Sequence, residues 1–94
     1  MSIELNKQTH SVKTKSRTEH LTPKEYSILS FLMEHPNTTF TAQEIYETIW
    51  QETPYVCEGI IAVHLRHIRE KIEEDPSHPV YIRSSWGYGY RFEQ

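Results

Sequence analysis

The amino-acid sequence predicts one α+β domain in which short antiparallel strands precede three helices and a β-hairpin ends the chain. Three observations predict this fold class. Hydrophobic residues alternate with polar ones at both ends of the chain, they recur at helical spacing in between, and no repeat, low-complexity tract or linker divides the 94 residues. We expect a single domain over 1–94, with a small sheet at 1–20, a three-helix core at 22–75 and a hairpin at 80–92.

Residues 1–20 have the pattern of short strands with one solvated face. Ile3, Leu5 and Val12 alternate with polar residues, and the stretches 6–9 and 14–16 look like turns. A small basic cluster in this region is either solvated edge-strand charge, which we favour because it discourages edge pairing, or part of a binding patch. The cluster consists of Lys13, Lys15 and Arg17.

Two capping boxes mark the first two helices. In each box a threonine precedes a glutamate by three residues, so that each side chain can accept the backbone N–H of the other. The first box begins at Thr22, and its helix should end near His35 because Pro36 disfavours helical geometry in the residue before it. The second box begins at Thr41 and predicts a short helix over 42–51.

The third and longest helix is expected over 57–74. A connector at 52–56, which contains Pro54, precedes it, and the pair Asp75-Pro76 ends it. Hydrophobic residues recur every three or four positions along this helix, which indicates one buried stripe. The residues that we expect in the core are Leu29, Leu32, Ile45, Ile49, Ile61, Leu65, Ile68 and Ile72.

The C-terminal segment alternates again and predicts a hairpin. Val80, Ile82 and Ser84 share one side of its first strand, and Tyr90 and Phe92 show the matching alternation on the second strand. The glycines between the strands allow positive φ in the turn. The turn 86–90 is aromatic, so its side chains either contact a partner such as DNA or fold back onto the core. We expect Tyr90 to be partly in the core and Tyr88 to be exposed.

Composition excludes several function classes. The longest apolar run, residues 60–63, is too short for a membrane span or a secretory signal. A single cysteine, Cys57, excludes an internal disulfide framework and suits a reducing cytoplasm. Ten Lys and Arg against thirteen Asp and Glu give a net charge of −3, so the distribution of the cations must decide whether nucleic acid is a partner. No catalytic motif is present, so we expect neither an enzyme nor a cofactor.

The outer face of the third helix is a candidate nucleic-acid surface. Away from the buried stripe, it carries Gly59, Val63, Arg66, His67 and Glu70 at helical spacing. A helix with cationic and hydrogen-bonding residues in its middle can enter a DNA major groove, which is about 12 Å wide. The alternative is that this face is simply solvated, and from the helix alone that alternative is favoured.

Two further interpretations concern the same region. His64 and His67 lie three residues apart, but a structural zinc site takes four ligands and the chain has one cysteine, so we expect no metal. Cys57 lies near a helix N-terminus, where a thiol pKa can fall, so a redox sensor is conceivable. A small buried residue is the favoured interpretation of Cys57.

Four motifs together carry a resemblance to a known family. They are Leu-Thr-x-x-Glu at 21–25, Ile-Trp at 49–50, Val-His-x-Arg-x-x-Arg-x-Lys at 63–71 and Gly-x-Gly-Tyr-Arg-Phe at 87–92. With these motifs the chain resembles, over nearly its whole length, the C-terminal effector domain of OmpR/PhoB-type response regulators. The resemblance implies a winged helix-turn-helix fold, with the third helix as recognition helix and the hairpin as wing, and it implies DNA binding and transcription regulation.

The resemblance also implies roles for individual residues. Arg66 and His67 are expected at or near base edges, with Val63 beside them, whereas His64, Arg69 and Trp50 are expected at the DNA backbone. The wing residues that would approach DNA are Arg83, Ser84, Trp86 and Tyr90. The connector is the loop that would meet RNA polymerase, and it comprises Gln51, Glu52, Thr53, Pro54, Tyr55 and Val56.

The chain departs from the family pattern at four positions. Gly59 and Ile60 stand where many members have Arg and Thr, and His67 replaces a permanent cation with a side chain that is mostly neutral at pH 7. Trp86 stands where some members have an arginine for the minor groove. Fewer cations mean weaker phosphate binding, so we expect weak binding by the monomer and pairing as a dimer on tandem half-sites.

The resemblance further implies a cytoplasmic protein whose receiver domain lies outside this chain and whose partners include a sensor kinase. A different class of function remains open, because winged helices also bind proteins. On that alternative, the chain is a degenerate DNA reader that contacts RNA polymerase or another regulator. A positive stripe that joins Arg66, Arg69 and Arg83 favours DNA, and a neutral aromatic patch favours protein.

Overall fold

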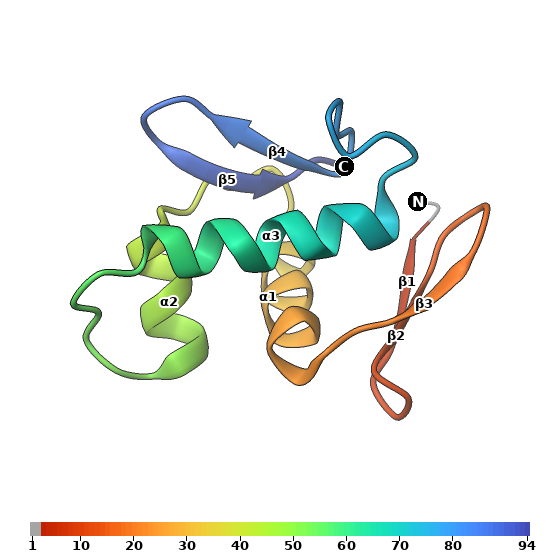
Figure 1. Ribbon diagram of the computed structural model, residues 1–94, viewed down its shortest axis with the longest axis horizontal. Helices are drawn as coiled ribbons and strands as arrows, with labels where there is room; N and C mark the ends of the chain where they lie inside the picture. The colour runs from red at the N-terminus through yellow and green to blue at the C-terminus, as the bar shows by residue number, and fades with distance from the viewer. Residues whose placement is uncertain (1–2) are drawn as a thin grey trace.

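The computed structural model describes residues 3–94 and has the expected α+β class, with strands and helices in the predicted order (Figure 1). Its elements are β1 (Glu4–Asn6), β2 (Ser11–Lys13), β3 (Thr18–His20), α1 (Pro23–Glu34), α2 (Ala42–Trp50), α3 (Glu58–Ile72), β4 (Ile82–Ser85) and β5 (Gly89–Phe92). In Figure 1, α3 crosses the middle of the molecule. The β4–β5 hairpin lies on one side of it, α1 and α2 lie on the other, and the N-terminal sheet lies near its C-terminal end.

The N-terminal strands form an antiparallel sheet of order β1-β2-β3. Val12 in the central strand pairs with Leu5 and Glu19 and is fully buried, as the alternation predicts. The side chain of Asn6 accepts the backbone N–H of Gln8 at 3.0 Å, which closes the predicted turn between β1 and β2. The sheet therefore turns one face to the core and the other to solvent.

Both predicted capping boxes form. The Thr22 hydroxyl accepts the Glu25 N–H at 3.2 Å, and the Glu25 carboxylate accepts the Thr22 N–H at 3.0 Å. The box at Thr41 and Glu44 has the same pair of bonds at 3.0 and 2.9 Å. Each box satisfies backbone donors that a helix N-terminus otherwise leaves without a partner. These local bonds fix where α1 and α2 begin.

The helix α3 is shorter at both ends than the predicted range 57–74. Cys57 is the N-cap, with non-helical φ −126° and ψ −13°. At the other end Glu73 is extended and buried, and its carboxylate accepts the backbone N–H groups of residues 80–82 at 2.8 to 3.2 Å. A buried carboxylate requires such donors. The long-range contact ends the helix before Glu73, although glutamate itself favours helix.

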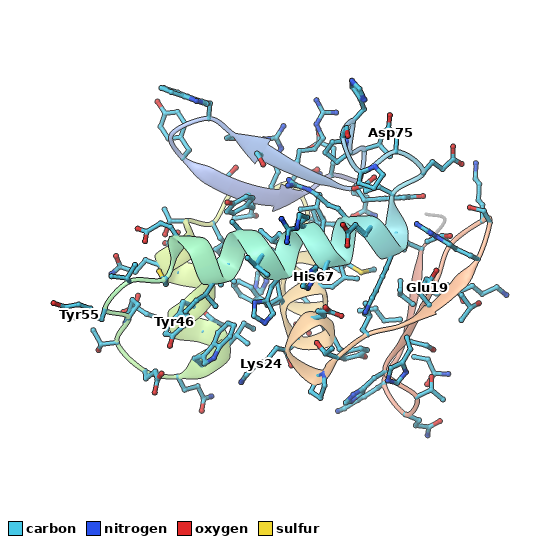
Figure 2. All side chains as sticks on the ribbon, viewed as in Figure 1. Glu19, Lys24, Tyr46, Tyr55, His67 and Asp75 are labelled. Atoms are coloured by element: carbon cyan, nitrogen blue, oxygen red, sulfur yellow. The ribbon has the colours of Figure 1, made fainter. Side chains whose placement is uncertain are left out.

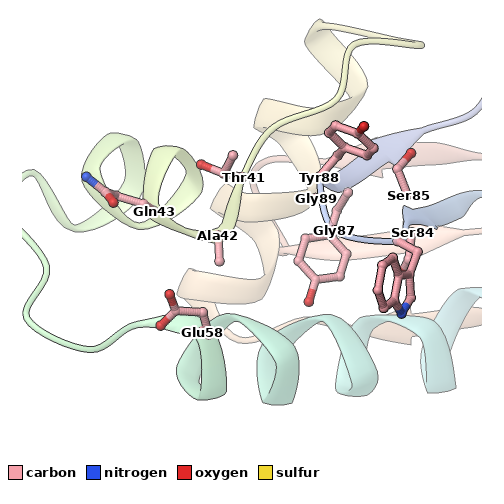
Figure 3. Close-up of a pocket in the computed structure, with 11 residues that line it drawn as sticks. Thr41, Ala42, Gln43, Glu58, Ser84, Ser85, Gly87, Tyr88 and Gly89 are labelled. Atoms are coloured by element: carbon pink, nitrogen blue, oxygen red, sulfur yellow. The ribbon is translucent and has the colours of Figure 1, made fainter.

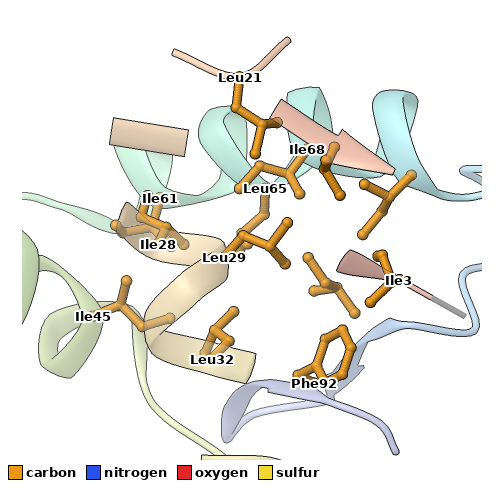
Figure 4. Close-up of a cluster of buried hydrophobic side chains, with 13 residues drawn as sticks. Ile3, Leu21, Ile28, Leu29, Leu32, Ile45, Ile61, Leu65, Ile68 and Phe92 are labelled. Atoms are coloured by element: carbon orange, nitrogen blue, oxygen red, sulfur yellow. The ribbon is translucent and has the colours of Figure 1, made fainter. Parts of the chain in front are cut away.

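The stripe of α3 packs into one hydrophobic core with residues from every other layer (Figure 4). Seven of the eight predicted core residues are at most 2% exposed, and Ile49 is half-buried and packs against the cluster. Leu21, Ile82 and Phe92 were not among the expected core residues, and all three are fully buried. Leu21 comes directly before the capping box of α1, and Ile82 and Phe92 pair across the hairpin, so their burial anchors these two segments in the core.

The hairpin pairs Ile82 with Phe92 and Ser85 with Gly89. The predicted strand residue Val80 is instead an exposed loop residue. Its N–H donates to Glu73 rather than to a neighbouring strand, so β4 begins only at Ile82. The expectation for Val80 was therefore wrong, since the carboxylate of Glu73, directly after α3, accepts the backbone N–H that a strand would use.

Candidate nucleic-acid interface

The outer face of α3 lies opposite its buried stripe. Along this face Gly59 and Val63 come first, Arg66 follows in the middle and Glu70 lies near the end, and all four are exposed. Within residues 3–94, the guanidinium of Arg66 has no hydrogen bond and no ion pair. Its five N–H donors are therefore available to a partner.

The hairpin flanks one side of this face and is attached to it through Arg69. The guanidinium of Arg69 donates to the carbonyl oxygen of Ile82 at 3.0 and 3.1 Å and to the hydroxyl oxygen of Ser84 at 2.8 Å. It also lies 5.9 Å from the ring centroid of Tyr90. Burial lowers the pKa of Arg69, and the charges of Tyr90 and Glu73 oppose that effect. Arg69 thus fixes the position of the wing relative to α3.

The outer surface of the hairpin keeps polar groups free. Ser84 accepts from Arg69, and its own hydroxyl proton remains available to a phosphate oxygen. Arg83 is exposed and pairs in register with Arg91, whose Nε donates to Glu93 at 2.7 Å. This ion pair compensates the charge of Arg91, whereas the Arg83 side chain is exposed to solvent.

The hairpin tip is aromatic and exposed, as expected. Trp86 is 96% exposed and Tyr88 is exposed, whereas Tyr90 is half-buried and packs against the core. Figure 3 shows the tip beside the beginnings of α2 and α3, with an open pocket lined by Thr41, Glu58 and Ser85 among others. Of the two predicted outcomes, folding onto the core holds for Tyr90 and exposure holds for Trp86.

Trp50 and His64 flank the other side of α3. The Trp50 indole stacks on Tyr46 with ring centroids 4.6 Å apart. It is nearly perpendicular to the His64 ring at a centroid distance of 5.4 Å, and its ring centroid lies 5.0 Å from the ammonium nitrogen of Lys24. Its indole N–H has no hydrogen-bond partner among residues 3–94. Lys24 adds a cation to this flank. Its position two residues after the helix cap Thr22 does not indicate a binding role in the sequence.

The tautomer of His64 follows from its contact. Its Nδ1 lies 2.8 Å from the carbonyl oxygen of Ile60, and a carbonyl can only accept, so Nδ1 carries a proton there. In the neutral ring Nε2 is then an acceptor, which repels a phosphate oxygen. His64 therefore contacts phosphate favourably only as the imidazolium.

His67 lies on the side of α3 that faces α1 (Figure 2). Its Nδ1 is 3.7 Å from the buried carboxylate of Glu25, to which Lys71 donates at 2.7 Å. Burial raises the pKa of Glu25, but hydrogen bonds from Lys71 and Thr22 and the charges of Lys71 and His67 outweigh it, so the pKa is lowered. The family resemblance predicts His67 at or near the bases, and the sequence pattern around Glu25 indicates only helix capping.

The connector presents protein surface beside the start of α3. Tyr55 is fully exposed and Val56 is largely exposed, while Pro54 is half-buried. Glu52 is held by the Tyr46 hydroxyl, which donates at 2.8 Å, and Gln51 takes a left-handed conformation at the end of α2. The arrangement leaves an aromatic and a branched apolar side chain free to contact a macromolecule.

Cys57 and Arg17, one member of the basic cluster, have structural roles. Burial first, and then the charges of Glu58 and Glu47, raise the pKa of the Cys57 thiol, which keeps it protonated and unreactive. Arg17 donates to the carbonyl oxygens of Glu70 and Glu73 at 2.8 and 3.0 Å, so it caps the C-terminus of α3. This contact removes Arg17 from any binding patch.

Over residues 3–94, no helix is long and apolar enough to cross a membrane. In the same range, no three His, Cys, Asp or Glu side chains gather in a way that could hold a metal ion.

Comparison with known proteins places this geometry in a family. Residues 16–92 match the family described as "Transcriptional regulatory protein, C terminal". The chain is 40% identical over 91 residues to "Uncharacterized transcriptional regulatory protein YrkP" of Bacillus subtilis (strain 168), which covers 96% of this chain and 39% of that protein. It therefore spans well under half the length of this curated relative.

Two solved structures have the same fold. The response regulator DrrB, described as a Thermotoga maritima OmpR/PhoB homolog, superposes with a TM-score of 0.85 at 32% identity, covering 100% of this chain and 42% of that one. The AdeR DNA-binding domain in complex with an intercistronic region gives 0.79 at 30% identity, covering 100% and 95%. The chain belongs to the family of C-terminal domains of transcriptional regulatory proteins, and its fold is the winged helix of OmpR/PhoB-type response regulators.

Proposed function

We propose that the chain binds duplex DNA in a sequence-specific manner and regulates transcription as the output domain of a response regulator, with α3 in the major groove. The observation that carries this proposal is the position of Arg66. Its unpaired guanidinium lies on the exposed face of α3, between the Trp50 flank and the wing. Arginine donates two parallel hydrogen bonds to guanine, and a groove-bound helix places such a side chain at the base edges.

The other predicted contacts follow from the two flanks. Val63 and His67 lie beside Arg66 on α3, while Trp50 and His64 meet the backbone on one side and Arg69 meets it on the other. The wing contributes Arg83, Ser84, Trp86 and Tyr90. Arg69 and Tyr90 also bind each other and the hairpin, so their contribution to DNA binding includes holding the wing in place.

Further partners belong to the same proposal. A regulator of this type receives its signal from a receiver domain and a sensor kinase, acts in the cytoplasm where the chromosome lies, and binds tandem half-sites as a dimer. The exposed side chains of the connector 51–56 support a contact with RNA polymerase through this loop. Each contact is a binding function, so the domain needs no cofactor.

A second candidate function is a winged-helix module that binds protein instead of DNA. It is favoured by the net charge of −3 and by the fully exposed Tyr55 next to Val56 and the apolar start of α3. Salt dependence separates the two candidates, because DNA binding releases about 0.9 counterion for each phosphate neutralised.

The test is selection from a pool of random duplexes, followed by fluorescence anisotropy in a salt series. We expect enrichment of a direct-repeat motif and an affinity that falls steeply as salt rises. Weaker binding to one half-site than to the tandem pair supports dimer formation on DNA. No enrichment and no salt-dependent binding refute the DNA proposal and favour the protein-binding module.

A further inference from the structure

The first two turns of α3 have an apolar exposed surface. Val56 is 68% exposed, Ile60 is 41% exposed and Val63 is 43% exposed, and together with Gly59 and His64 they line a shallow hollow. A Cβ atom built on Gly59 meets nothing within 4 Å, so the hollow opens to solvent at this position. Exposed apolar side chains gathered at one place on a small domain indicate a contact surface.

This part of the helix offers no side-chain hydrogen-bond donor that could read a base. The Nδ1 proton of His64 goes to the Ile60 carbonyl oxygen. Glu58 is an acceptor, and its carboxylate turns back to the N–H of Cys57 at 3.3 Å. Donors on the outer face begin only with Arg66, about two turns after Gly59. The beginning of α3 therefore cannot read guanine or adenine through bidentate hydrogen bonds.

The major groove presents one apolar group on its base edges, the C5-methyl group of thymine. The N-terminal part of a recognition helix is also the part that reaches the base edges in this type of docking. The hollow is continuous with the face that carries Arg66. The shape, polarity and position of the hollow therefore all fit the C5-methyl group of a thymine in the duplex that Arg66 contacts.

We propose that Ile60 and Val63, around the open position of Gly59, select thymine in the half-site by packing on its C5-methyl group. This inference rests on the proposed DNA binding and adds which base this part of α3 selects. Val63 lies three residues before Arg66, an axial distance of about 4.5 Å, and base pairs are about 3.4 Å apart. The thymine therefore lies one or two base pairs from the base that Arg66 contacts.

The experiment replaces the thymines of the selected operator one at a time by deoxyuridine, which lacks the methyl group and keeps every hydrogen-bonding group. Affinity of the wild-type domain is measured by anisotropy. We expect a loss of about three- to fivefold at one or two thymines in each half-site, which is the effect of one buried methyl group. The same replacement outside the half-sites is the control and leaves the affinity unchanged.

Protein variants assign the effect to these residues. In Val63→Ala and Ile60→Ala, both at exposed positions, the penalty for deoxyuridine at the sensitive thymine shrinks to less than twofold. The inference is overturned if deoxyuridine is tolerated at every thymine of an operator that the domain binds specifically, or if both variants keep the full penalty. If Val63→Ala and Ile60→Ala both bind the unmodified operator with wild-type affinity and keep the full deoxyuridine penalty, the hollow is instead a site for a protein. Failure to bind any duplex refutes the proposed function itself.

Discussion

The Arg66 side chain is exposed to solvent and has no partner within residues 3–94, and both properties matter for DNA recognition. A guanidinium that is already engaged, as in Arg69, must give up its hydrogen bonds before it can bind a base. Arg66 gives up only hydrogen bonds to water, so binding to a base does not break any contact within the described protein.

We expect Arg66→Ala to weaken binding to the selected operator by about 1–3 kcal/mol and to relax its specificity at one base pair. The matched control is Lys7→Ala, which removes one cation in the turn between β1 and β2, far along the chain from α3. Anisotropy with the operator and its single-base variants measures both. An equal loss on all sequences assigns Arg66 to phosphate instead of a base.

At the scale of elements, the wing is held by α3 on one side and by the segment before α2 on the other. Arg69 and Glu73 bind the strand β4 and the loop before it. Phe40 exchanges two backbone hydrogen bonds of 2.8 Å with Tyr90 of β5. The hairpin is thus placed relative to the recognition helix mainly through its own backbone groups, which bind the side chains of Arg69 and Glu73 and the backbone of Phe40.

Gly89 is the position where this placement is most sensitive. It has a φ of +147°, and a Cβ there would collide with the carbonyl oxygen of Phe40 and lie 2.6 Å from its carbonyl carbon. Gly87 has a φ of +80° but open space around it. We expect Gly89→Ala to lower the free energy of unfolding by at least about 2 kcal/mol and Gly87→Ala by about 1 kcal/mol, measured by urea denaturation. Equal effects of the two variants would show that β5 can move away from Phe40.

At the scale of the whole molecule, local patterns predicted most of the fold. The capping boxes and the stripe of α3 are interactions within a few residues, and their expected positions agree with the structure. The end of α3 and the start of β4 could not be predicted, because both depend on Glu73 accepting N–H groups seven to nine residues away. The role of Arg69 in holding the wing and the position of His67 beside Glu25 likewise depend on tertiary contacts.

The buried carboxylate of Glu25 links α1 to α3 through Lys71, so its ionisation acts on the stability of the whole domain. The folded state lowers its pKa below the ordinary value of 4.5. A lowered pKa means that its contribution to stability is fully present above the ordinary value and is lost as pH falls through the folded-state value. The domain should therefore lose this contribution only in acid.

Glu25→Gln tests this link because glutamine keeps an acceptor for the Thr22 N–H and loses the charge that pairs with Lys71. We expect the variant to be less stable than the wild type by about 1–3 kcal/mol near pH 7. The difference should shrink as pH falls from about 5.5 toward 3, since the wild-type carboxyl then becomes neutral as well. Urea denaturation across this range measures it, with the exposed Glu34→Gln at the other end of α1 as control. A difference that stays constant with pH means that the shape of the buried side chain, and not its charge, holds α1 against α3.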